Sequence, residues 1–289
     1  MTRLVLGLAI GAILQVPSFH AETRLVVLHV SVRTARGEVV TTLDRDAFTV
    51  YENGRRQPVS IFRRDDIPVS VGLLIDNSGS MRAARPRVEA AALAFANASH
   101  PDDELFVVNF ADKARLDVPF TSERTVLDRS IARVDAVGGT AMRDAVEVAE
   151  TYLHDCGKMD RRALLIITDG NDNASTVSLD RIARAAEQRE IVIYAIGVFG
   201  HEDPAAANRA RKALDHLTER SGGLSYYPSS LDQVQAVALD IAHQIRHQYT
   251  VAYAPIDQRL DGSYRTIRVK VSGPDRYVVR TRAGYRATR

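Results

Sequence analysis

The sequence predicts an α/β fold, a doubly wound and mostly parallel sheet inserted into a small β-sandwich-like unit built from the two ends of the chain. Two apolar stretches, residues 71–76 and 163–169, each end in an aspartate. Apolar runs of this length bounded by turn residues are typical of central strands covered on both faces. Strand and helix patterns alternate between about residue 66 and residue 247, whereas the two flanks carry only strand patterns.

The first flank has the pattern of a small β unit. Apolar and polar residues alternate over 28–33, and residues 47–51 predict a second strand. Residues 52–54 (Glu-Asn-Gly) predict a hairpin-type turn, and residues 57–62 the returning strand. Isolated hairpins are marginal in water, so this segment needs a partner.

The partner is expected at the other end of the chain. Residues 248–253, 264–271 and 277–282 are strand candidates, separated by turn residues. We expect the two flanks to pack as one β unit. The side chains expected to meet there are Leu28, Val30, Val32, Phe48 and Val50 on one side and Tyr253, Ile267, Val269 and Val271 on the other.

Between the flanks, the sequence predicts the alternation that a doubly wound sheet requires. The expected strands are 71–76, 104–110, 115–120 at an edge, 162–169, 191–198 and 224–227. The expected helices are 88–99, 122–134, 141–154, 179–188, 204–221 and a last helix that ends at about Arg246. Ser178 is the expected N-cap of helix 179–188, and Gly222-Gly223 is expected to end helix 204–221. A capping box of Ser230 and Gln233 is expected to open the last helix. The predicted division is a signal peptide at 1–21, the two β halves at 22–65 and 248–289, and the α/β domain at 66–247.

Composition narrows the class of partner. The 289 residues exceed the usual size of one domain, and 45% hydrophobic with 26% charged residues is typical of a soluble globular protein. A net charge of only +2 gives no argument for nucleic acid or an anionic membrane. There is no Trp, and the single cysteine, Cys156, excludes an intrachain disulfide.

The N-terminus has the features of a secretory signal peptide. Arg3 precedes a short apolar run over residues 4–16, and Ala21 suits the last position before cleavage. Cleavage after Ser18 is the competing position, and an uncleaved anchor is the alternative. The run is shorter than the ~20 residues of a membrane-spanning helix, and no later stretch is long and apolar enough to span. We expect export, to the periplasm or outside the cell.

Three segments carry oxygen ligands at strand ends. Asp76, Ser78 and Ser80 follow the first central strand, and Asp169 ends the second. Thr140 follows a Gly-Gly turn that leads into a helix. Carboxylate and hydroxyl oxygens form a hard ligand set, which suits Mg²⁺ or Mn²⁺ and suits Zn²⁺ poorly.

The D-x-S-x-S loop, the later Thr after Gly-Gly and the strand-terminal Thr-Asp-Gly together resemble a von Willebrand factor A domain. The resemblance implies a Rossmann-like fold and a metal-ion-dependent adhesion site matched by Asp76, Ser78, Ser80, Thr140 and Asp169. It also implies that a Glu or Asp of a partner protein completes the coordination of the ion. The flanks resemble bacterial proteins with related A domains, notably at residues 48–54 and 282–285, and imply no activity.

The expected function is therefore an exported, cation-dependent protein-binding module of the adhesion type, and not an enzyme. A cation-bearing accessory or assembly subunit of a larger envelope enzyme or secretion complex is the alternative. The sequence does not indicate the partner, the process or the oligomeric state.

The sequence gives little support for an enzyme active site or for a zinc or calcium site. The chain has no G-x-S-x-G elbow, Walker loop or dinucleotide fingerprint. Cys156 is expected to be a partly buried structural thiol. His243 and His247 have the spacing of a zinc pair, but Gln244 stands where a general base would lie. Residues 169–180 depart from a calcium loop at its sixth and twelfth positions, so we reject that site.

Overall fold

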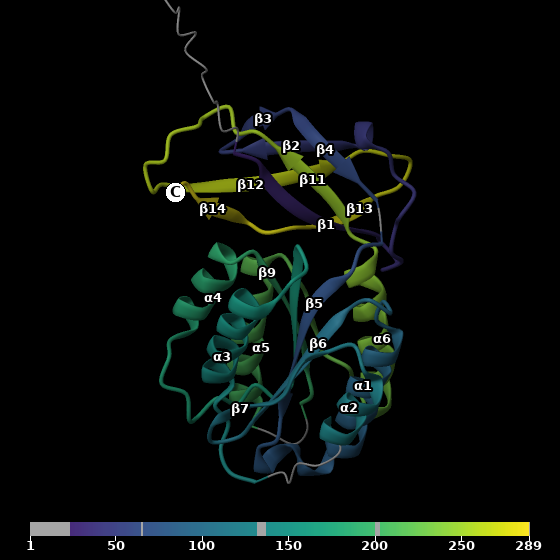
Figure 1. Cartoon of the computed structure of the whole chain (residues 1–289), viewed down its shortest axis with the longest axis vertical. Helices are drawn as coiled ribbons and strands as arrows, with labels where there is room; N and C mark the ends of the chain where they lie inside the picture. The colour runs from purple at the N-terminus through teal and green to yellow at the C-terminus, as the bar shows by residue number, and fades with distance from the viewer. Residues whose placement is uncertain (1–23, 65, 132–136, 200–202, 289) are drawn as a thin grey trace, which may run out of the picture.

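The computed structural model describes residues 24–64, 66–131, 137–199 and 203–288. The predicted signal peptide at 1–21 lies outside these residues. Two parts are stacked along the long axis of the molecule, a β unit above an α/β domain (Figure 1). Among the described residues, no helix is long and apolar enough to cross a bilayer.

The α/β domain is built on a six-stranded sheet in the order β10-β9-β8-β5-β6-β7. All neighbours are parallel except β6 and β7, which confirms the mostly parallel fold. The strands are β5 (Val69–Asp76), β6 (Glu104–Phe110), β7 (Ala114–Thr121), β8 (Arg161–Thr168), β9 (Ile191–Gly197) and β10 (Ser225–Tyr226). Every residue of β5 is buried, as expected for a central strand covered on both faces.

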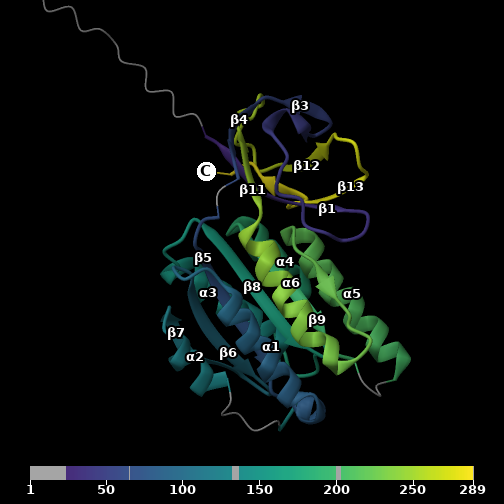
Figure 2. The same cartoon turned by 90° about the vertical axis from the view of Figure 1, so that its right-hand side faces the viewer.

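Helices cover both faces of this sheet (Figure 2). One face packs against α1 (Arg85–Ala98), α2 (Arg124–Ile131) and α6 (Val234–Arg246). The other face packs against α3 (Met142–Cys156), α4 (Leu179–Gln188) and α5 (Pro204–Ser221). After β5 the chain adds β6 and β7 toward one edge of the sheet, and it then crosses back to place β8 on the other side of β5. The strand order therefore reverses between β5 and β8.

The β unit contains two four-stranded sheets, in the orders β13-β1-β11-β4 and β14-β12-β2-β3. Its strands are β1 (Val26–Thr34), β2 (Phe48–Glu52), β3 (Arg55–Gln57), β4 (Val59–Arg63), β11 (Tyr249–Tyr253), β12 (Tyr264–Val271), β13 (Tyr277–Arg280) and β14 (Gly284–Arg286). Both sheets contain strands from the two ends of the chain, which alternate in the first sheet and meet at the β12–β2 pair in the second. One apolar core joins the sheets and includes Leu28, Val50, Val251 and Val269, while Val271 is only partly buried.

Several elements differ from the sequence prediction. The expected single return strand at 57–62 is divided at Pro58, and its two parts, β3 and β4, belong to different sheets. Proline has no N–H for a ladder hydrogen bond, so the chain changes sheets there. The three-residue strand β14 was not predicted. The predicted capping box is wrong by one residue, because Gln233 accepts from the backbone N–H and hydroxyl of Ser229.

The hairpin turn and two helix ends are confirmed. Asn53 and Gly54 both have positive φ, 47° and 78°, as a type I′ turn requires. Ser178 caps α4 through a hydrogen bond from the Arg181 N–H, and Gly222 ends α5 with a left-handed φ of 92°.

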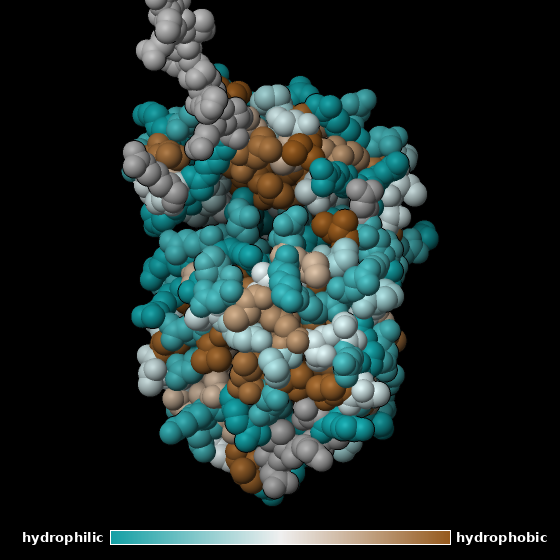
Figure 3. All heavy atoms as spheres, viewed as in Figure 1, coloured by the Kyte–Doolittle hydropathy of each residue, from teal (hydrophilic) through white to brown (hydrophobic). Residues whose placement is uncertain are grey.

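Polar contacts fix the β unit to the amino-terminal edge of the parallel strands. The Arg161 guanidinium, at the start of β8, donates to the carbonyl of Gln248 at 3.0 Å and to the Thr250 hydroxyl at 2.9 Å. Arg33 pairs with Asp240 at 2.7 Å. Figure 3 shows mainly hydrophilic residues along this boundary. The carboxyl ends of the parallel strands therefore lie at the opposite end of the molecule, away from the β unit (Figure 1).

Candidate metal centre

Asp76 is the last residue of β5 and is fully buried. Its Oδ1 accepts a hydrogen bond from the Ser78 backbone N–H at 2.8 Å, and its Oδ2 accepts one from the Thr168 hydroxyl at 2.5 Å. The pKa of this carboxyl is raised to about 6, mainly by burial and also by the nearby Asp169 carboxylate, while the hydrogen bonds from Ser78 and Thr168 oppose the shift. A cation beside Asp76 would oppose both effects, because it stabilises the ionised carboxylate.

Ser78 and Ser80 lie on the loop directly after Asp76. Ser78 is buried, Ser80 is exposed, and their hydroxyl oxygens are 3.1 Å apart. The backbone turns there into a short 3₁₀ helix at Gly79–Ala83. Two hydroxyls at this spacing have lone pairs that one small cation could share.

The Thr140 loop rests on the Ser78 loop through backbone hydrogen bonds. The Gly79 N–H donates to the Gly138 carbonyl at 3.1 Å, and the Val137 N–H donates to the Asn77 carbonyl at 3.0 Å. Gly138 has a φ of 88°, and a Cβ there would lie 2.3 Å from the Asp112 carboxylate. Only glycine fits this position, so the Gly-Gly turn brings Thr140 to the same edge as Asp76.

Asp169 follows β8 directly, on the other side of the strand-order reversal. It is 2% exposed, and its Oδ1 accepts a hydrogen bond from the Asn171 N–H at 3.1 Å. Its Oδ2 is buried and accepts no hydrogen bond from any described residue. A buried carboxylate oxygen without a donor is costly, and a bound cation would satisfy it. The five predicted residues thus meet the chemical demands of a hard divalent ion at a strand-order reversal, where open α/β sheets bind ligands.

Three further residues hold these loops, and the sequence analysis did not identify them. Thr168 donates to Asp76, Asp112 accepts from the Gly139 N–H at 2.6 Å, and Asn173 accepts from the Thr140 N–H at 2.9 Å. Thr168 was visible in the Thr-Asp-Gly stretch. Asn173 belongs to the segment that was considered only as a calcium loop.

The other singled-out residues lie away from this edge. Cys156 is exposed, so the expectation of a partly buried thiol is wrong, because α3 ends there at the surface. The rings of His243 and His247 stack with centroids 4.0 Å apart. In the described parts of the chain, no three His, Cys, Asp or Glu side chains lie close enough together to bind a metal. The candidate site is not a cluster of this kind, because three of its five candidate ligands are hydroxyls.

Known proteins resemble this chain in sequence and in fold. Residues 71–171 match the family model described as von Willebrand factor type A domain, a span that includes all five candidate ligands. A protein of Borreliella burgdorferi described as uncharacterized is 22% identical over 180 residues, which are 61% of this chain and 52% of that protein. The chain thus spans about half the length of this curated relative.

Solved structures share the fold at low sequence identity. A von Willebrand factor type A protein from Catenulispora acidiphila superimposes with a TM-score of 0.56 and 14% identity, covering 84% of this chain and 73% of that one. Proximal thread matrix protein 1 of the mussel byssus, solved with zinc in its metal-ion-dependent adhesion site, gives a TM-score of 0.53 and 20% identity, covering 68% and 50%. Domains of this type are mostly non-enzymatic and mediate contacts between proteins. Residues 71–171 of the α/β part therefore match a von Willebrand factor type A domain, and the α/β part has the fold of such domains.

Proposed function

We propose that the protein is an exported, divalent-cation-dependent protein-binding module. In this proposal Asp76, Ser78, Ser80, Thr140 and Asp169 hold one Mg²⁺, and a Glu or Asp of a partner protein completes its coordination. The observation that carries the proposal is the buried Oδ2 of Asp169, which has no hydrogen-bond donor among the described residues. Next to it, at the same edge, Asp76 is a second buried carboxyl.

The donor set explains how such a site would recognise an acidic partner. Hydroxyl ligands are neutral, so two carboxylates leave a divalent ion without an excess of negative charge around it. Mg²⁺ also keeps bound water readily, which leaves a position for an incoming carboxylate. Mn²⁺ has similar preferences.

The first test is metal binding. Calorimetric titration of the purified protein is expected to show one Mg²⁺ or Mn²⁺ site, and Asp76→Ala is expected to abolish it. Asp76→Asn, which keeps an acceptor for Thr168, is expected to weaken binding strongly because it removes the charge. Asp128→Ala changes an exposed carboxylate on α2 and serves as the matched control. Unchanged affinity in Asp76→Ala, with native far-UV circular dichroism, would refute the assignment.

Partner capture is tested on envelope extracts. The immobilised protein is expected to retain a partner in Mg²⁺ and to release it in chelator, and the Asp76→Ala variant is expected to retain none. Substitution of single acidic residues in the captured partner then identifies the one that reaches the ion. A partner that stays bound in chelator and to the variant would contradict the proposal.

An accessory role is the second candidate. It is favoured by the β unit, which hydrogen bonds and ion pairs hold firmly against the edge opposite the candidate ion. Such an arrangement leaves two separate ends for contacts within a larger assembly. Copurification with an ATPase or a protease would favour this role over capture of a single acidic motif.

Export is part of the proposal and rests on residues 1–21. The mature protein is expected to begin near Glu22, or near Phe19 if cleavage follows Ser18. Mass spectrometry of fractionated cells measures this end directly. Soluble cytosolic protein with an intact Met1 would exclude export.

A further inference from the structure

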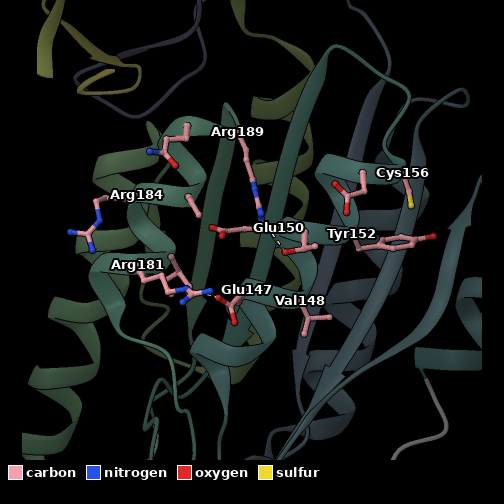
Figure 4. Close-up of a pocket in the computed structure, with 13 residues that line it drawn as sticks. Glu147, Val148, Glu150, Tyr152, Cys156, Arg181, Arg184 and Arg189 are labelled. Carbon is pink, nitrogen blue, oxygen red and sulfur yellow. Dashed lines mark hydrogen bonds and ion pairs between the residues drawn. The ribbon is translucent and has the colours of Figure 1, made fainter. Parts of the chain in front are cut away.

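A cavity of about 720 Å³ lies between α3 and α4, on a different part of the domain from the candidate ion. Figure 4 shows residues that line it, with Arg181 from α4 next to Glu147 from α3 and Arg189 extending toward Glu150. Cavities of this size accommodate small organic molecules. None of the predicted metal ligands lines it.

Glu150 is the polar group that this cavity leaves unsatisfied. Its side chain is 0% exposed, and neither carboxyl oxygen makes a hydrogen bond with a described residue. Figure 4 places its carboxyl group between the two helices, near the end of Arg189. Burial raises the pKa of Glu150 to about 8; Arg189 opposes this shift and Glu147 adds to it. A neutral carboxyl group carries one O–H donor that here has no acceptor.

Three arginines and two further acids, Glu147 and Asp155, line the cavity around Glu150. The Arg189 guanidinium donates only to the Thr151 hydroxyl, at 3.2 Å, and has no carboxylate partner among the described residues. Arg184 is exposed, and its guanidinium has neither hydrogen bond nor ion pair in the described part of the chain. Arg181 is the one arginine of the cavity wall that is paired, with Glu147 at 2.7 Å. Two guanidinium groups and one acid proton are therefore available to an acceptor.

The cavity also has an apolar wall. Val148 is 41% exposed although it is a large hydrophobic residue, and Ile182 and Ala185 lie opposite on α4. A bare inorganic ion would leave this wall in water, whereas an organic molecule would cover it.

We propose that the cavity between α3 and α4 is a second binding site, which takes a small organic anion. Its carboxylate or phosphate group accepts hydrogen bonds from Glu150 and Arg189, and its apolar body covers Val148 and Ala185. Arg184 supplies further positive charge at the mouth. A cationic ligand fits less well, because it would have to ionise a buried acid and would face two unpaired guanidinium groups.

The test uses three probes of the same ring size, namely benzoate, phenyl phosphate and benzylamine. All measurements use the Asp76→Ala variant without added metal, so that no carboxylate can bind through an ion at the other site. Binding is measured by calorimetry. The rate at which iodoacetamide alkylates Cys156 locates the probe, because Cys156 is the only cysteine and lines the cavity.

At least one of the two anions is expected to bind and to slow alkylation of Cys156, and the tighter of the two identifies the head group. Benzylamine is expected to do neither. Protection by benzylamine and not by the anions would overturn the proposal, and so would the absence of binding by all three probes.

Substitutions then identify the contacts. Glu150→Leu and Arg189→Gln are each expected to weaken anion binding by about tenfold or more, since each removes a hydrogen bond to a charged group. Glu150→Gln is expected to retain binding, because its amide N–H can donate in place of the acid. Arg268→Gln removes the same charge from an exposed position of β12 and is the control. Unchanged affinity in both Glu150→Leu and Arg189→Gln, with the variants shown to be folded, would overturn the proposal.

Discussion

Deleting residues 248–289 is expected to expose residues 24–64 to protease while the α/β domain stays folded. The deletion removes β11 and β13, the two neighbours of β1, and β12, a neighbour of β2. It also removes half of the apolar core that joins the two sheets. At about 25 cal/mol per Å² of apolar surface, even a modest part of that core contributes several kcal/mol. The α/β sheet has no strand from this segment, so its own core is retained.

Limited trypsin digestion measures this difference. Arg36 and Arg56 are exposed in the intact protein but lie on segments that the two sheets hold in place. The truncated protein is expected to be cut at these arginines much faster than the full chain, while a fragment beginning near residue 66 resists. Full-length Val251→Asp, which places a charge in the same core, is expected to show a weaker form of the same effect. Equal rates of digestion would show that residues 24–64 do not depend on the C-terminal strands.

The sequence predicted most strands and the candidate ligands because both depend on local patterns. A strand can be predicted from the apolar run that ends in Asp76. A turn can be predicted from the two glycines before Thr140. The separation of β3 from β4 depends instead on which sheet each strand joins. Pro58 shows that a ladder is interrupted, and β3 stays beside its hairpin partner β2, but β4 pairs with β11, almost 200 residues later.

Buried charges were the main omission. Alternation along 264–271 places Arg265 on the same face as Ile267 and Val269, and that face is the core. An arginine is not expected in an apolar core unless a carboxylate pairs with it. Its partner here is Glu52, which is 213 residues away in the sequence. Glu150 likewise lies in an ordinary helical pattern, and only the packing of α4 shows that it is buried. Such residues depend on distant contacts, which a single sequence does not reveal.

Glu52→Ala is expected to lower the free energy of unfolding by about 3–5 kcal/mol, because it leaves a buried guanidinium without its carboxylate. Glu52 is 3% exposed, and its Oε1 accepts from Arg265 at 3.1 Å. Its Oε2 accepts from the hydroxyls of Tyr253 and Tyr285, each at 2.8 Å. Urea unfolding monitored by circular dichroism measures the loss. Asp232→Ala breaks an exposed pair with Arg87, also at 2.8 Å, and is expected to cost less than ~1 kcal/mol.

The double variant Glu52→Ala/Arg265→Met separates the pair from its surroundings. Arg265 also donates to the carbonyls of Asp257 and Arg259, so part of its charge is satisfied without Glu52. If the carboxylate is the main partner, the two substitutions together cost less than the sum of the single ones, with a coupling of about 1–3 kcal/mol. A coupling near zero would mean that the two carbonyls suffice for Arg265. The loss in Glu52→Ala would then come from Tyr253 and Tyr285, and Glu52→Gln, which keeps an acceptor for a tyrosine hydroxyl, would recover much of it.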